Sequence, residues 1–120
     1  LHPRVRRQRQ MCIRDSYVAD KRETAARYVE FFKGKEDITF FTEPADCKSN
    51  YWLNAVVLKD KEAQLDFLEY TNDHGVMTRP VWELMNRLPM FEHCETDGLE
   101  NTEWLADRVV NIPSSVRLEN

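Results

Sequence analysis

A helical pattern of apolar residues follows residue 20. Asp20 has the short polar side chain of a helix N-cap, and Glu23, three residues later, completes a capping box. Gly34 supplies a C-terminal stop, because glycine readily adopts the left-handed conformation that ends many helices. The sequence therefore predicts a helix over residues 20–33 whose inward stripe is Ala25, Tyr28, Val29 and Phe32.

Three further helices are predicted downstream. The first runs from an Asp60 cap to about residue 73, with Gly75 after it and Leu65, Phe67 and Leu68 as its apolar part. The second spans residues 80–88, because Pro80 suits a first helical position and apolar residues then recur at helical spacing. The third is short and follows a cap at Asn101 or Thr102, and it carries Trp104 and Leu105.

Four short segments have the composition of β-strands. Residues 51–58 are mostly apolar, which predicts a central strand covered on both faces. Residues 38–41, 76–78 and 108–112 are shorter candidates. Together with the helices, this order predicts an α/β domain in which a mixed sheet of three to four strands is covered by helices.

Residues 1–16 differ from the rest of the chain. They hold five arginines and one acidic residue, and the run Arg6–Ser16 resembles the translation of a transposon-based sequencing-library adapter. We therefore expect residues 1–16 to be a non-native segment, disordered or extraneous, and residues 17–120 to be the native part, which begins in the middle of a gene. The alternative is a basic arm that binds nucleic acid or anionic lipid.

Composition excludes several classes of protein. The 120 residues carry 17 basic and 21 acidic side chains, and without residues 1–16 the balance is 12 to 20. This acidity argues against nucleic acid as the main partner, and no apolar run is long enough to span a membrane. Three dispersed cysteines fit a reducing cytoplasm, and no cysteine or histidine pair has metal-ligand spacing. We therefore expect a cytoplasmic domain with no metal.

The segment Gly75–Trp82 contains the most informative candidate chemistry. Arg79 is predicted beside a helix N-terminus, where a guanidinium could bind a carboxylate or phosphate. Trp82, one turn into that helix, could stack on a planar or sugar ring. The alternative is that Arg79 only pairs with an acidic side chain and that Trp82 only fills the core. Asn50–Trp52 is similarly ambiguous, and core packing is favoured there.

Three runs of the chain resemble one family. They are Ser49–Asn54, Thr71–Trp82 and Asn101–Ser115, and they resemble the C-terminal part of the DegT/DnrJ/StrS sugar aminotransferases, most closely the LegC-like branch linked to legionaminic-type sugars. The resemblance implies the small C-terminal domain of the aspartate aminotransferase superfamily (fold type I). It also implies a homodimeric parent enzyme that uses pyridoxal 5′-phosphate (PLP) to move an amino group, usually from glutamate, to a nucleotide-linked keto-sugar.

The resemblance also implies what this chain lacks. The large domain is absent, and with it the Schiff-base lysine, so no catalytic or cofactor-binding residue is carried over. The substrate-side residues of the family map onto Arg79, Val81 and Trp82. Two alternatives stay open: a PLP-dependent sugar dehydratase of the same family, in which histidine replaces the lysine, and a stand-alone binding or interaction module.

A domain separated from its partner domain is expected to expose apolar surface. The candidates for contacts with the large domain are Tyr28, Phe31, Phe32, Trp52 and Trp82. An exposed patch of several hundred Å² would make the isolated chain marginally stable or prone to aggregate.

Overall fold

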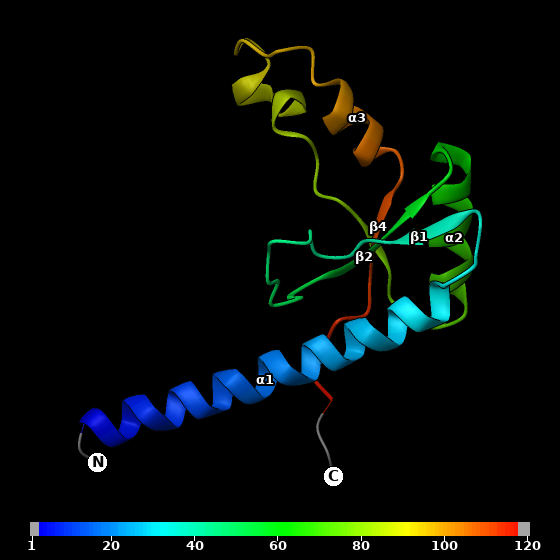
Figure 1. Cartoon of the computed structure of the whole chain (residues 1–120). Helices are drawn as coiled ribbons and strands as arrows, with labels where there is room; N and C mark the ends of the chain where they lie inside the picture. The colour runs from blue at the N-terminus through cyan, green and yellow to red at the C-terminus, as the bar shows by residue number, and fades with distance from the viewer. Residues whose placement is uncertain (1–2, 118–120) are drawn as a thin grey trace.

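A computed structural model describes residues 3–117 as a small sheet with helices around it (Figure 1). Two strands follow the first helix, a helix precedes each of the other two strands, and two 3₁₀ turns, η1 and η2, precede the last helix. The elements in order are α1 (Pro3–Phe32), β1 (Ile38–Phe40), β2 (Asn54–Leu58), α2 (Lys61–Asp73), β3 (Arg79–Pro80), η1 (Met85–Arg87), η2 (Pro89–Phe91), α3 (Glu100–Ala106) and β4 (Val109–Ile112).

The sheet has four strands in the order β1-β2-β4-β3. All the described pairings are antiparallel, whereas the sequence analysis expected a mixed sheet. Val56 lies opposite Phe40 on one side and Val110 on the other, so three apolar side chains form one row across the sheet. The expected α/β class, with a sheet of three to four strands and β2 at a central position, is confirmed.

The core lies on one face of the sheet. Along β2 the buried positions alternate, because Val56 and Leu58 are buried while Val57 between them is partly exposed. The expectation that this strand is covered on both faces is therefore wrong. The core consists of Ala25, Phe40, Val56, Leu58, Val110 and Ile112, with side chains of α1 and α2 packed against it.

Helix α2 begins and ends as the sequence predicts. The Asp60 side chain accepts a hydrogen bond from the Ala63 N–H at 2.8 Å. At the other end Gly75 has a φ of +79°, and the N–H groups of Gly75 and Val76 donate to carbonyls in the last turn of the helix. These bonds fix the direction in which the chain leaves α2 towards β3.

The inward face of α2 differs from the prediction by one residue. Gln64 is fully buried and Leu65 is exposed, since Gln64, Phe67, Leu68 and Thr71 form the row that faces the sheet. The Gln64 amide donates to the carbonyls of Ala106 and Val109, each at 2.9 Å. A buried amide thus joins α2 to the connection between α3 and β4.

Helix α1 extends further than predicted. It starts at Pro3 and passes through Asp20, so Asp20 is not an N-cap; its carboxylate instead accepts a hydrogen bond from the Arg117 N–H at 3.0 Å. Residues 5–16 are exposed along this helix, which projects beyond the sheet (Figure 1). Residues 3–16 are therefore helical here, and their origin in an adapter and the boundary at Tyr17 stay predictions.

The helix predicted over residues 80–88 is absent from the described chain. Arg79 and Pro80 pair with Asn111 and Val110 as β3, and the chain then has no regular secondary structure up to η1. Leu88 has a ψ of 135° because the ring of the following Pro89 disfavours the helical region. Helix α3 begins at Glu100 after Leu99, so neither Asn101 nor Thr102 is its cap.

Candidate functional site

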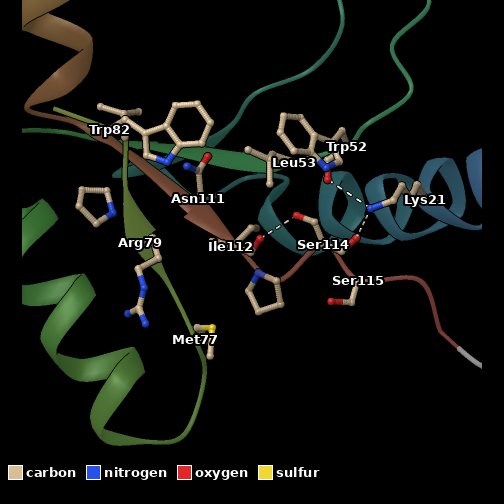
Figure 2. A pocket seen from close by; sticks show the side chains of 13 residues that line it. Lys21, Trp52, Leu53, Met77, Arg79, Trp82, Asn111, Ile112, Ser114 and Ser115 are labelled. Atoms are coloured by element: carbon tan, nitrogen blue, oxygen red, sulfur yellow. Dashed lines mark hydrogen bonds between the residues drawn. The ribbon is translucent and has the colours of Figure 1, made fainter. Parts of the chain in front are cut away.

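An open hollow of about 720 Å³ lies beside the end of β4. Four parts of the chain form its walls: α1, the segment before β2, the segment around β3, and the residues that follow β4 (Figure 2). The lining residues are Lys21, Trp52, Leu53, Met77, Arg79, Pro80, Val81, Trp82, Asn111, Ile112, Pro113, Ser114 and Ser115.

The three site residues predicted from the sequence all line this hollow, in a setting that differs from the prediction. Arg79 lies in β3, opposite Asn111, and its guanidinium donates to the Thr78 carbonyl at 3.3 Å. It points away from the indole of Trp82 (Figure 2). The residues that follow it, 81–84, form no helix, so the expected assistance from a helix N-terminus is wrong.

Trp82 and Val81 occupy the wall next to Arg79. Trp82 is 82% exposed, so its side chain does not fill the core, and it lines the same hollow as Asn111 (Figure 2). Val81 is half-buried. A hollow lined by an exposed indole, a guanidinium and an amide can bind a polar ligand that has one flat or apolar face.

Buried Thr78 holds the segment that carries these residues. Its hydroxyl lies 2.6 Å from that of Thr71, and the Asn72 side chain donates to its carbonyl at 3.2 Å. The end of α2 thereby fixes the position of Thr78, the residue directly before Arg79 and β3. Sequence reasoning identified the turn at Gly75 but not the two polar side chains that anchor it.

Lys21 is another residue of the site that the sequence did not indicate. Its ammonium donates to the Ser114 carbonyl at 2.7 Å and to the Trp52 carbonyl at 3.2 Å (Figure 2). These bonds join two walls of the hollow to α1. No local pattern in the sequence indicates them, since the partners are 31 and 93 residues away.

An ion pair next to the hollow fastens the loop before β2 to α1. The Arg22 guanidinium donates to both carboxylate oxygens of Glu43, at 2.8 and 2.9 Å. The Arg22 bond and the backbone N–H of Ser49 lower the pKa of the Glu43 carboxyl from 4.5 to about 2. The charged form of Glu43 is therefore the form that the fold stabilises.

The lowered pKa of Glu43 predicts an acid-dependent loss of stability. The contribution of this carboxylate should be complete above pH 4.5 and should decline as the pH falls towards about 2. Glu43→Gln should lower the urea midpoint at pH 7 and flatten its decline between those two pH values. Glu30→Gln is the control, because Glu30 is exposed on α1 about two turns beyond Arg22; it should change neither the urea midpoint at pH 7 nor its decline in acid. A decline in Glu43→Gln as steep as that of the wild type would contradict the assignment.

The residues around the hollow do not fit PLP by themselves. Its described lining contains no carboxylate that could pair with a protonated pyridine nitrogen, and the ammonium of Lys21 is engaged by two carbonyls. Within residues 3–117 there is also no cluster of three or more metal-ligating side chains, and no helix there is long and apolar enough to cross a bilayer.

Comparison with solved structures identifies the same arrangement in larger proteins. The sugar aminotransferase CalS13 from Micromonospora echinospora is 24% identical over 88% of this chain, with a TM-score of 0.72. DesV from S. venezuelae, solved with a ketimine intermediate, is 22% identical over 88%, with a TM-score of 0.74. The E. coli GDP-4-keto-6-deoxy-D-mannose-3-dehydratase with hydrated PLP is 16% identical over 82%, with a TM-score of 0.65. The chain spans 27%, 28% and 26% of these proteins, respectively.

The family assignment rests on the sequence. No curated protein sequence matches the chain. The profile of the DegT/DnrJ/EryC1/StrS aminotransferase family, however, matches residues 7–120, which is nearly the whole chain and includes ten residues before Tyr17. The resemblance seen in the three sequence runs is thereby confirmed at the level of the family: the chain belongs to the DegT/DnrJ/EryC1/StrS aminotransferases.

Proposed function

We propose that this chain is the C-terminal small-domain part of a PLP-dependent sugar aminotransferase. The family match over residues 7–120 carries the proposal, and it is supported by the fold shared with solved proteins more than three times as long. In the parent enzyme, which we propose is a homodimer, the large domain would supply the lysine and the other residues that hold PLP. The cofactor provides the electron sink for amino transfer when bound.

The proposed substrates are an amino donor, glutamate, and a nucleotide-linked keto-sugar of the legionaminic type. Both carry anionic groups, and Arg79 supplies an exposed cation on the wall of the hollow. A guanidinium binds a carboxylate or a phosphate with two parallel hydrogen bonds. Trp82 would cover a flat face of the substrate, and Val81 would set the depth to which the substrate enters.

Replacing Arg79 tests this role in the full-length enzyme. Arg79→Ala should raise the KM for glutamate or for the sugar nucleotide by about tenfold or more, because a charge-assisted hydrogen bond contributes about 1.5–3 kcal/mol. Arg87→Ala is the matched control, since Arg87 lies in η1 outside the hollow and pairs with Glu83 at 3.6 Å. Wild-type KM values for both substrates in Arg79→Ala would remove Arg79 from the site.

The isolated chain should not form a PLP adduct. Its hollow provides no carboxylate partner for the pyridine ring, and Lys21 is held by two carbonyls. Titration of the 120-residue chain with PLP should therefore give the absorbance spectrum of the free cofactor. Borohydride reduction should leave no cofactor covalently attached to the protein. A stoichiometric reduced adduct on Lys21 would overturn this expectation.

A sugar dehydratase is the second candidate. The fold likeness to the E. coli dehydratase, which has a TM-score of 0.65, is the observation that favours it. The residue that distinguishes the two activities belongs to the large domain: the resemblance implies lysine in the aminotransferase and histidine in the dehydratase. Reading the upstream coding sequence decides between them, and an upstream region without a PLP domain would contradict both.

A further inference from the structure

The turn that leads into β2 has a backbone conformation that needs support. Tyr51 has a φ of +46°, in the left-handed region that aromatic residues rarely adopt. The Tyr51 N–H donates to the Ser49 hydroxyl at 2.9 Å, and the Trp52 N–H donates to the Asn50 side chain at 3.0 Å. These local bonds shape the turn but do not connect it to the rest of the molecule.

Arg22 and Glu43 make that connection. Besides its two bonds to Glu43, the Arg22 guanidinium donates to the Ser49 carbonyl at 2.6 Å. Glu43 accepts the Ser49 N–H on its carboxylate, and its own N–H donates to the Tyr51 hydroxyl at 3.1 Å. The charged and titratable groups that face Glu43 are Arg22 from α1 together with Lys48 and Tyr51 from its own loop.

The turn held in this way carries one wall of the hollow. Trp52 follows Tyr51 directly; its side chain is 62% exposed and lines the hollow, and its carbonyl accepts a bond from Lys21 (Figure 2). Because Trp52 has little packing of its own, its position depends on the backbone of the turn.

We propose that Arg22 and Glu43 are positioning residues for Trp52: their ion pair holds the left-handed turn at Tyr51 and so fixes the wall of the hollow that Trp52 forms. The inference concerns residues of this chain alone and does not depend on the proposed substrates. Neither Arg22 nor Glu43 lines the hollow, so both act through the turn.

Amide hydrogen exchange at neutral pH tests the proposal on the ¹⁵N-labelled 120-residue chain. Glu43→Gln keeps the shape of the side chain but removes its charge, and the Ser49, Tyr51 and Trp52 amides should then exchange about tenfold faster or more. The Leu58 amide, bonded to the Arg108 carbonyl at 2.9 Å in the core, should accelerate much less than the turn amides, by no more than the loss of global stability that the urea midpoint of the same variant measures. The indole N–H resonance of Trp52 should shift, whereas those of Trp82 and Trp104 should not.

Two further variants complete the experiment. Arg22→Lys keeps the charge but loses the two-pronged bond, so it should give an intermediate acceleration. Arg27→Gln removes a surface pair with Glu23 on the same helix, 3.0 Å long, and should change nothing in the turn. Unchanged turn amides in Glu43→Gln would overturn the proposal. So would an acceleration shared equally by Leu58, because the pair would then serve overall stability and not the position of Trp52.

Discussion

Replacing Gln64 by leucine should destabilise the chain by about 2–4 kcal/mol, since each buried polar group left without a partner costs about 1–3 kcal/mol. Gln64 is fully buried, and its amide is hydrogen-bonded to the carbonyls of Ala106 and Val109, each at 2.9 Å. Leucine has a similar volume but no donor, so both carbonyls would lose this bond inside the fold. The predicted loss is a large part of the total stability of a small domain.

Urea unfolding followed by far-ultraviolet circular dichroism measures this loss. Glu69→Gln, a substitution at an exposed position on the same helix, should change the free energy of unfolding by less than about 0.5 kcal/mol. Lys61→Met removes the hydrogen bond from the Lys61 ammonium to the Gln64 Oε1, 3.0 Å long, and should cost less than Gln64→Leu, because it leaves one buried polar atom without this partner and not two. A Gln64→Leu midpoint equal to that of the wild type would show that the two carbonyls find other partners.

Gln64 also shows why the sequence predicted α2 but not its inward face. The cap at Asp60 and the stop at Gly75 are local signals, and both are confirmed. The choice between Gln64 and Leu65 is not local. It depends on two carbonyls more than 40 residues away that need a donor, and a hydrophobic pattern assigns such a position to the apolar neighbour.

The difference between local signals and long-range contacts also explains which features of the hollow the sequence predicted. The sequence points to Arg79 and Trp82 for the binding chemistry of a guanidinium and an indole, and the structure places both residues on one hollow. The helix expected beneath them did not form, because the pairing of Arg79 and Pro80 with β4 is a long-range contact that competes with the apolar periodicity of residues 81–88. Lys21 was missed for the same reason, since both its partners are distant in sequence.

Aromatic residues expected to contact a large domain divide into two groups. Tyr28 and Phe32 pack against the core, where Tyr28 stacks on Phe40 with ring centres 5.7 Å apart, so for these two the expectation is wrong. Phe31, Trp52 and Trp82 are exposed, as expected. The sequence pattern could not separate the groups, because inward and outward aromatic residues alternate within α1.

The exposed rim of the hollow should make the isolated chain self-associate. Trp52, Met77 and Trp82 are all exposed there; at about 150–250 Å² for a whole side chain, the exposed fractions of the two tryptophans, 62% and 82%, amount to roughly 220–360 Å². The chain is also less compact than a single domain of its length, with a radius of gyration of 17.9 Å, whereas about 14 Å is typical. An exposed apolar patch of a few hundred Å² is often a surface at which a partner binds.

Sedimentation velocity over a range of concentrations measures this association. The double variant Trp52→Ser/Trp82→Ser should weaken it by about tenfold or more, because buried aromatic side chains dominate the energy of most protein interfaces. Phe31→Ser is the matched control: Phe31 is as exposed as Trp52 but lies on α1 outside the hollow, so its removal should have a smaller effect. A wild-type chain that stays monomeric at all concentrations, or a control that weakens association equally, would show that the rim of the hollow is not the surface that needs a partner.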